Sequence, residues 1–190
     1  MNRNFWANKK VFITGHSGFK GSWLSLWLLK LGAKVKGYSL PPNTEPNICS
    51  LFNLSSHMTS EFGDINDYEK LFKSIDSFKP EIIFHMAAQP LVRYSYKNPL
   101  ETYKTNVIGT ANLLESVRCI NNIRAVVNIT TDKCYENNDD NIAYAENDRM
   151  GGNDPYSSSK ACSELVTNAF RKSYFPTNNY NNHGVALASV

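Results

Sequence analysis

The stretch Lys10-Val11-Phe12-Ile13-Thr14-Gly15-His16-Ser17-Gly18-Phe19-Lys20-Gly21 decides the fold. Its apolar, β-rich beginning is followed directly by glycines at the spacing Gly-x-x-Gly-x-x-Gly. A helical pattern then runs from about Lys20 to Leu31 and stops at Gly32, a residue that commonly ends helices. The order strand, glycine turn, helix is the context in which such a triplet binds a nucleotide.

Each glycine of this turn has its own expected use. Gly15 permits a tight turn, Gly18 lets the backbone approach a pyrophosphate, and Gly21 lets the helix pack closely on the strand. The N-terminus of the helix offers unpaired N–H groups to the phosphates. His16 and Lys20 lie in the same turn, where they could face phosphate or solvent.

Apolar β-rich runs alternate with helical-period segments along the rest of the chain. This alternation predicts a parallel sheet with helices on both faces, a Rossmann-like doubly wound α/β fold, as one NAD-binding domain over residues 1–190. Asn137 to Asn141 is expected to be a loop, and Asp64 or Asn66 is expected to cap the helix that follows it. The expected strands are 10–14, 34–38, a run ending near Gly63, 81–86, 125–129 and 184–190, and the expected helices are 20–31, 66–78, 99–119 and 155–172.

The composition excludes several classes of function. Hydrophobic residues make up 42% of the 190 residues and charged residues 19%, ordinary values for a globular protein. The net charge is only +3, and no Lys/Arg run interleaves with aromatic residues, so no nucleic-acid partner is expected. No run reaches the ~18 apolar residues of a membrane span. Met1 to Lys10 is polar, so no signal peptide is expected.

The cysteines argue for a reducing compartment and against a metal. They stand far apart, with no CxxC pair and no Cys/His set at zinc spacing, so we expect free thiols, a cytoplasmic protein and no metal site. The four cysteines are Cys49, Cys119, Cys134 and Cys162.

One position departs from the general dinucleotide pattern. An acidic residue is expected at the end of the second strand, where it would hold the adenine ribose. The segment Gly37-Tyr38-Ser39-Leu40 has none. Ser39 could contact the ribose instead, and this position leaves the choice between NAD and NADP open.

A second set of residues points to proton transfer. Tyr156 and Lys160 lie one helical turn apart, and Thr131 and Asp132 follow the apolar strand that ends near Ile129. Free tyrosine titrates near ~10, so a tyrosine that acts as a base at neutral pH needs a lowered pKa. Lys160 on the same helix face would supply a cation that favours phenolate. By itself, a Tyr and a Lys at this spacing more often form a surface pair on a helix. The glycine turn and the Thr131-Asp132-Lys133 run make the catalytic interpretation the favoured one here.

Together these motifs resemble the extended short-chain dehydrogenase/reductase family, and within it the sugar-nucleotide 4,6-dehydratases, most of all those that act on CDP-glucose. Relatives acting on dTDP-glucose carry Asp-Glu where this chain has Asp132-Lys133. The resemblance covers essentially the whole chain. Beyond the glycine turn and Tyr-x-x-x-Lys, the matching runs are Gly63-Asp64-Ile65, His85-Met86-Ala87-Ala88-Gln89, Thr105-Asn106-Val107-Ile108-Gly109-Thr110, Ala88-Gln89-Pro90-Leu91-Val92-Arg93, Thr131-Asp132-Lys133-Cys134-Tyr135 and Gly151-Gly152-Asn153-Asp154-Pro155-Tyr156-Ser157.

The resemblance implies NAD as the cofactor and CDP-glucose as the substrate. NAD would take hydride from C4 of the sugar, water would leave across C5 and C6, and the hydride would return to C6. The product would be a 4-keto-6-deoxy sugar nucleotide, a precursor for deoxysugars such as those of lipopolysaccharide O-antigens. The residues implied in cofactor binding are Gly15, His16, Ser17, Gly18, Phe19, Gly21, Ser39, Asp64, Ile65, Ala87, Ala88, Gln89, Asn106, Thr130, Tyr156 and Lys160.

The resemblance also implies catalytic roles. Tyr156 would be the base for the 4-hydroxyl, and Thr131 would hydrogen-bond the sugar O4. Asp132 would protonate the departing 6-hydroxyl, which requires partial burial to keep a proton on the carboxyl. Lys133 would be either a neutral base at C5 or a cation that stabilises an enolate.

The remaining expectations concern the substrate pocket and the chain as a whole. Gln89 and Arg93 are expected to contact the sugar nucleotide, and the helices over 99–119 and 155–172 are expected to pair in a homodimer. Family members continue for about as many residues again and place a substrate domain there, so we expect that domain to be absent and the fragment alone to be inactive. Two alternatives stay open: another sugar-nucleotide epimerase or reductase, and a dinucleotide-binding fragment without turnover.

Overall fold

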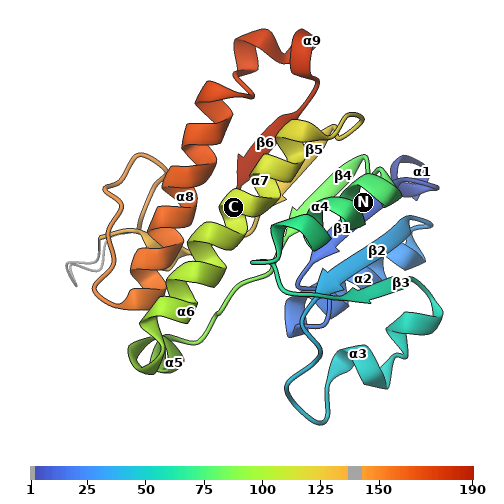
Figure 1. Ribbon diagram of the computed structural model, residues 1–190, viewed down its shortest axis with the longest axis horizontal. Coiled ribbons are helices and arrows are strands. Elements are labelled where there is room, and N and C mark those ends of the chain that lie inside the picture. The colour runs from blue at the N-terminus through green and yellow to red at the C-terminus, as the bar shows by residue number, and fades with distance from the viewer. Residues whose placement is uncertain (1–2, 137–142) are drawn as a thin grey trace.

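The computed structural model describes residues 3–136 and 143–190, and the loop expected at Asn137 to Asn141 lies outside this part. Six parallel strands form one sheet in the order β3-β2-β1-β4-β5-β6 (Figure 1). This order confirms the predicted Rossmann-like α/β fold. The strands are β1 (Lys10–Thr14), β2 (Lys34–Ser39), β3 (Thr59–Phe62), β4 (Ile82–His85), β5 (Ala125–Asn128) and β6 (Ala186–Ser189).

Helices cover both faces of the sheet. On one face lie α1 (Arg3–Trp6), α2 (Phe19–Lys30) and α3 (Ile48–Leu51), and on the other α4 (Tyr68–Phe78), α7 (Gly109–Cys119) and α8 (Pro155–Ser173), with α7 and α8 side by side in Figure 1. The shorter helices are α5 (Val92–Lys97), α6 (Pro99–Tyr103) and α9 (Tyr180–His183), with the single turns η1 (Leu54–Ser56), η2 (Lys104–Ile108), η3 (Asp132–Cys134) and η4 (Thr177–Asn179).

Strand β1 shows how the sequence builds two cores. Successive side chains of a strand point to opposite faces, and every residue from Val11 to Thr14 is fully buried. Val11 and Ile13 pack with Leu28 of α2, whereas Phe12 packs with Leu113 of α7 on the other face. The continuous apolar run of β1 therefore reflects a central strand covered on both sides.

Two helix boundaries differ from the sequence-based expectation. The helix expected over 99–119 consists of α6, a π-helical turn (η2) and α7. Helix α4 begins at Tyr68 because Asp67 caps it and accepts from the Lys70 N–H, so Asp64 and Asn66 are not its caps. Asp64 instead accepts hydrogen bonds from the backbone and side chain of Asn66, which closes the turn before the helix.

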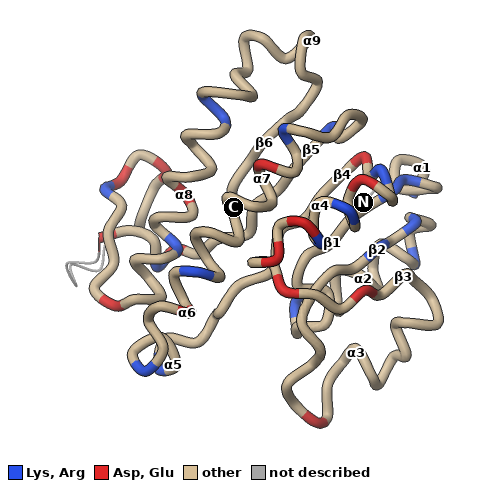
Figure 2. The backbone as a smooth tube through the Cα atoms, viewed as in Figure 1, with Lys and Arg blue, Asp and Glu red and all other residues tan. Residues whose placement is uncertain are grey.

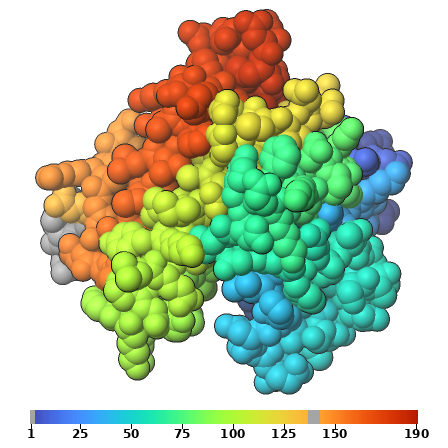
Figure 3. Space-filling view, viewed as in Figure 1, coloured from blue at the N-terminus to red at the C-terminus, as the bar shows by residue number. Residues whose placement is uncertain are grey.

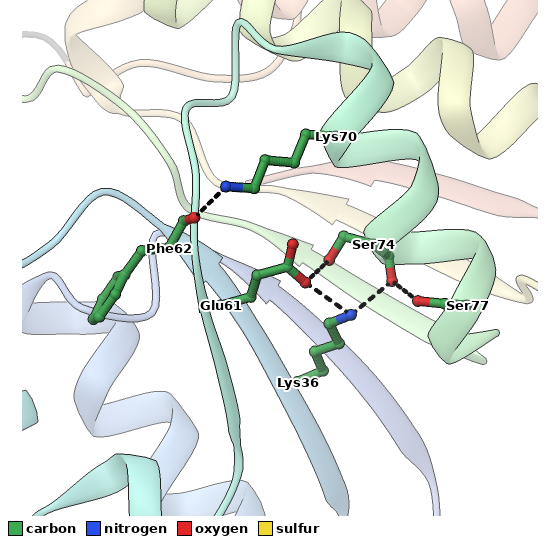
Figure 4. A network of polar contacts seen from close by, with 6 residues as sticks. All are labelled: Lys36, Glu61, Phe62, Lys70, Ser74 and Ser77. Carbon is green, nitrogen blue, oxygen red and sulfur yellow. Dashed lines mark hydrogen bonds and ion pairs between the residues drawn. The ribbon is translucent and has the colours of Figure 1, made fainter.

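A buried lysine fastens the outer strands to α4 (Figure 4). Lys36 of β2 donates to the Ser74 carbonyl at 3.1 Å and lies 3.0 Å from the Glu61 carboxylate of β3. Ser74 Oγ donates to the same carboxylate at 2.7 Å. Burial alone would raise the pKa of Glu61, but the hydrogen bonds from Ser74 and Lys36 outweigh it and hold that pKa below its usual value. The network secures β3, a strand at the edge of the sheet.

Among the residues that the structure describes, no helix is long and apolar enough to cross a membrane. The same residues include no group of three or more His, Cys, Asp and Glu side chains that could hold a metal ion. Lysine and arginine are spread over many elements of the backbone in Figure 2.

Candidate active site

A cavity of about 800 Å³ opens where the strands end. It lies where the chain order of the sheet reverses, between β1 and β4, the place where open α/β sheets bind ligands. Figure 3 shows the surface hollowed between the segment near residue 40 and the segment near residue 100, and the residues that line the cavity at its mouth include Pro41, Asn43, Leu100 and Lys104.

The first glycine turn forms one wall of this cavity. Gly15 has φ +76°, a left-handed conformation that favours glycine. A Cβ at this position would lie 2.7 Å from the Ala87 backbone nitrogen, and one at Gly21 would lie 2.1 Å from the Gly15 carbonyl oxygen. Gly15 therefore makes the turn, and Gly21 allows α2 to sit directly on it, as the spacing predicts.

Gly18 plays a different part. It is the N-cap of α2. A Cβ added at Gly18 would contact only the Gly15 carbonyl oxygen, at 3.4 Å. The first N–H groups of an α-helix have no intrahelical partner, and those of Phe19 and Lys20 begin α2 at the cavity wall. This geometry suits an anionic group such as a pyrophosphate.

The side chain of His16 does not line the cavity, and its expected part in cofactor binding stays a prediction. The imidazole is fully buried under the turn, with Nε2 2.6 Å from Ser60 Oγ and Nδ1 3.0 Å from Ser39 Oγ. It fills the space left by Gly37, where a Cβ would lie 2.2 Å from the ring. Burial lowers the pKa of His16 to about 4, so the ring is neutral and brings no charge to the cavity.

Ser17 and Ser39 hold the turn to the end of β2. Ser39 Oγ donates to Ser17 Oγ at 2.9 Å, and Ser17 Oγ donates to the Leu40 carbonyl at 2.7 Å. The Ser39 hydroxyl is thus engaged within the loop, although the residue lines the cavity. Its expected contact with a ribose stays a prediction.

The opposite wall comes from α8. Asp154 caps this helix and accepts from the Tyr156 and Ser157 N–H groups. Ser95 of α5 accepts a further bond from the Tyr156 N–H at 3.1 Å. Tyr156 and Lys160 are buried and both line the cavity, as expected.

The pKa of the Tyr156 phenol shifts in the direction opposite to the one that the spacing suggests. Burial raises its pKa; a hydrogen bond with Thr131 lowers it in part, and Asp132 and Asp154 raise it further. Lys160 is not among these influences. Its ammonium donates to the Ile129 carbonyl at 2.9 Å. Thr131 lies within hydrogen-bond reach of the Tyr156 phenol, which fits its expected place beside the tyrosine, whereas Lys160 does not lower the pKa of Tyr156 as expected.

The pKa of Lys160 itself is strongly lowered. Burial lowers its pKa from 10.5 to about 8, Glu164 opposes that shift, and Lys20 adds to it. Perturbed groups of this kind, lining a cavity, mark candidate functional sites.

Asp132 and Lys133 begin the short turn η3, which Thr131 caps by accepting from the Lys133 N–H. Both side chains are exposed. Asp132 accepts from the Thr131 hydroxyl at 3.1 Å. The role of general acid was expected to need partial burial of the Asp132 carboxyl, and the described residues do not bury it.

Gln89 and Asn106 form a connection inside the protein. Asn106 accepts from the Gln89 N–H at 2.8 Å and donates to the Gln89 carbonyl and to Ser159 Oγ of α8. The Gln89 amide bonds Thr102 and the backbone of Leu91. Both amides are satisfied within the protein, and the expected contact of Gln89 with the sugar stays a prediction. Arg93 is exposed on α5.

The lining of the cavity includes residues that were expected to form the site and others that were not. Thr130 lines the wall, and its hydroxyl is bonded to Glu164. The predicted residues found in the lining are Gly15, Ser17, Gly18, Phe19, Gly21, Ser39, Asp64, Ile65, Ala87, Ala88, Thr130, Tyr156 and Lys160. Lining residues not predicted as site residues include Tyr38, Leu40, Pro41, Pro42, Asn43, Asn66, Met86, Pro90, Leu100, Glu101, Lys104 and Thr105.

Comparison with known proteins identifies the family. The family described as GDP-mannose 4,6 dehydratase matches residues 12–184, nearly the whole chain. This chain belongs to that family. The expected resemblance to the extended short-chain dehydrogenase/reductases is thereby confirmed. Across all 190 residues the chain is 60% identical to the CDP-glucose 4,6-dehydratase of Salmonella typhimurium, of which it covers 53%.

Solved structures support the same fold. A UDP-glucose 4-epimerase from Thermotoga maritima, solved with UDP-glucose, is 25% identical with a TM-score of 0.74 over 87% of this chain and 52% of that one. An epimerase from Methanothermobacter thermautotrophicus is 27% identical with a TM-score of 0.78 over 90% of this chain and 50% of that one. The chain thus spans about half the length of these relatives.

Proposed function

We propose that this chain is the NAD-binding portion of a nucleotide-sugar 4,6-dehydratase that acts on CDP-glucose. The observation that carries the proposal is one cavity with the glycine turn on one wall and Tyr156, Thr130 and Lys160 on the other. The identity of 60% to a CDP-glucose 4,6-dehydratase supports this reaction and this nucleotide. The epimerases are similar in fold at much lower identity.

The residues present fit NAD. Gly15 and Gly18 leave room for a pyrophosphate at the start of α2. Asp64 and Ile65, at the end of β3, line the part of the cavity nearest β2 and would receive the adenosine portion. Tyr156 and Lys160 lie on the opposite wall, where Lys160 would hold the second ribose. Bound NAD would supply the hydride acceptor for the sugar C4.

The chain's own residues would handle the protons. Tyr156 would accept the proton of the 4-hydroxyl through its phenol oxygen, with Thr131 hydrogen-bonded beside it. Its raised pKa makes the role of base depend on a change in its surroundings that favours the phenolate. Asp132 would donate a proton to the leaving 6-hydroxyl once bound substrate covers its exposed carboxyl. Lys133 would act at C5, as a base or as an enolate-stabilising cation.

The assembly and setting belong to the same proposal. Pairing through α7 and α8 would give a homodimer, supported by the outward Leu165 of α8, which is 56% exposed. The free thiols Cys49, Cys119, Cys134 and Cys162 suit a reducing compartment, the cytoplasm. The product would feed deoxysugar formation, including that of O-antigens.

The test uses a protein that carries this chain at the full length of its relatives. Incubation with CDP-glucose and NAD should give a CDP-sugar lighter by one water, with the alkali-induced absorbance of a 4-keto sugar. A product of unchanged mass that is epimerised at C4 would indicate an epimerase and reject the dehydratase proposal. Binding of NAD without any change in CDP-glucose would support the alternative of a binding module.

A further inference from the structure

A chain of buried polar side chains lies behind the cavity and takes no part in the proposed proton transfers. It runs from β1 through β4 and α7 to α8 and β5, and each of its members is at most 2% exposed. These residues are Thr14, His85, Thr110, Ser163 and Asn128.

The hydrogen positions in this chain can be deduced from Thr14. Its Oγ1 accepts from the N–H groups of both Met86 and Ala87, each at 3.1 Å. A hydroxyl has two acceptor sites and one donor. With both acceptor sites used, the Thr14 proton must go to His85 Nδ1, which lies 2.7 Å away. Nδ1 of His85 is therefore the unprotonated nitrogen.

The other side of the ring gives the same answer independently. Thr110 Oγ1 donates to the Asn106 carbonyl at 2.7 Å, so it can only accept from His85 Nε2 at 3.1 Å. Nε2 therefore carries the hydrogen. Ser163 Oγ then donates to Thr110 at 3.0 Å and accepts from the Asn128 amide at 3.0 Å. Every donor in the chain meets an acceptor only when His85 is the neutral Nε2–H tautomer.

The electrostatic surroundings agree with this assignment. Burial, and after it the positive charge of Lys160, lower the pKa of His85 to about 3. A proton on Nδ1 would point a second donor at the Thr14 hydroxyl and leave one of the two without a partner.

The Met86–Ala87 peptide links this chain to the cavity. The Gly15 turn rests on that peptide so closely that a Cβ at Gly15 would lie 2.7 Å from the Ala87 nitrogen. Met86 and Ala87 also line the cavity between the glycine turn and Tyr156. At its far end the chain reaches Ser163, one turn beyond Lys160 on α8. The ring of His85 thus connects the support of the glycine turn to the catalytic helix.

We propose that His85 is a positioning residue for the dinucleotide site: held as the Nε2–H tautomer, it orients Thr14, which fixes the Met86–Ala87 peptide beneath the glycine turn. The proposal deepens the proposed function and rests on it for the identity of the ligand. His85 touches neither substrate nor cofactor in this role.

Two substitutions separate the two halves of the ring. In His85→Asn, the amide oxygen can take the place of Nδ1 and accept from Thr14, while the bond to Thr110 is lost. In His85→Gln, the amide nitrogen can take the place of Nε2 and donate to Thr110, while the Thr14 hydroxyl loses its acceptor. His85→Phe removes both bonds and keeps the ring volume. Ser116→Ala serves as the control, because it removes another fully buried hydroxyl, which donates to the Asn112 carbonyl on α7.

NADH affinity is measured by fluorescence titration of folded variants. It should be kept in the variants that retain the hydrogen bond to Thr14 and weakened in those that lose it. His85→Asn and Ser116→Ala should stay within about threefold of the wild type, and His85→Gln and His85→Phe should bind about tenfold more weakly, the effect of one lost buried hydrogen bond. Equal weakening by Asn and Gln, or affinities that track thermal stability alone, would overturn the positioning role.

A second measurement does not depend on any ligand. In a long-range ¹H–¹⁵N spectrum of the wild-type chain at neutral pH, the His85 signals (assigned by their loss in His85→Asn) should show an unprotonated Nδ1 and a protonated Nε2. The Nδ1–H tautomer or a cationic ring would overturn the inference. If the wild-type chain failed to bind NADH, the proposed cofactor would be wrong, and this spectrum would still decide the tautomer.

Discussion

Lys160 Nζ donates to the carbonyl oxygen of Ile129 over 2.9 Å, which ties α8 to the end of β5. The ammonium is thereby turned toward the strand. The neighbouring Tyr156 keeps a raised pKa, caused first by its burial. The site therefore holds a phenol with a raised pKa beside a buried lysine whose own pKa is lowered to about 8.

The lowered pKa of Lys160 predicts a pH-dependent stability. Between about pH 8 and 10.5 the unfolded chain holds a proton on this lysine that the folded chain has released. Stability contributed by this group therefore rises with pH across that window and is lost as pH falls through 8. Relative to Lys160→Met, the unfolding free energy of the wild type should increase by roughly 3 kcal/mol from the lower to the upper limit.

Urea unfolding at several pH values measures this difference. Lys172→Met is the matched control, because Lys172 lies on the same helix and is exposed. Its difference from the wild type should stay flat across the window. A flat difference for Lys160→Met as well would contradict the account of a buried, desolvated ammonium.

Much of the fold could be predicted because β1 and the glycine turn have strong local patterns. The direction of a side chain within that turn has no such pattern. His16 turns inward because Gly37 leaves a space and Ser39 and Ser60 supply partners, and residues from two other strands determine this. Gly37 and Ser39, the small residues at the end of β2, were the only feature of the sequence that could have predicted the buried position of His16.

The same limit explains two further differences. Gln89 and Asn106 stand in motifs that suggest ligand contacts, yet they satisfy each other across 17 positions of sequence. Such pairing is set by the path of the chain, because buried polar groups need partners wherever the fold brings them. The loop residues Pro41, Pro42 and Asn43 and the α6 residues Leu100 and Glu101 line the cavity, although no motif of the sequence covers them. For Pro41 to Asn43, a place directly after β2 was the only indication in the sequence.

The Lys36–Glu61 pair should respond unequally to removal of either partner. The Lys36 side chain is 9% exposed and that of Glu61 31% exposed. Glu61→Gln leaves a buried ammonium without its counter-charge and should cost roughly 3 kcal/mol. Lys36→Met leaves a carboxylate that still accepts from Ser74 and reaches solvent, and should cost about 1 kcal/mol.

Chemical unfolding of both single variants and the double variant measures these costs. The double variant should be more stable than Glu61→Gln alone, because it removes the unpaired ammonium. A larger loss for Lys36→Met than for Glu61→Gln would contradict this assignment of burial.

Gly18→Leu should abolish NADH binding and leave the fold intact. Its Cβ meets only the Gly15 carbonyl, at 3.4 Å, so the added side chain occupies the cavity. Gly21→Ala, by contrast, should unfold the turn, because its Cβ would lie 2.1 Å from that same oxygen. Thermal melting and NADH fluorescence separate the two effects. Undiminished binding by folded Gly18→Leu would reject the glycine turn as the pyrophosphate site.

The catalytic roles can be separated at the full length of the relatives. Tyr156→Phe removes the base, so no enzyme-bound NADH should form from CDP-glucose. Asp132→Asn leaves that first step intact and should accumulate NADH, with turnover lower by roughly 10²–10⁴. Absorbance of bound NADH in single-turnover experiments measures both. If Asp132→Asn blocked NADH formation as completely as Tyr156→Phe, Asp132 would be a residue that positions substrate.

The central claim is an internal transfer of hydride from C4 to C6 of one sugar, and isotope labelling tests it most directly. CDP-glucose carrying deuterium at C4 is converted by the full-length protein, and the product is analysed by NMR. The account predicts a CDP-4-keto-6-deoxyglucose with deuterium at C6. Deuterium retained at C4 of an epimerised CDP-sugar, or lost to solvent, would contradict it.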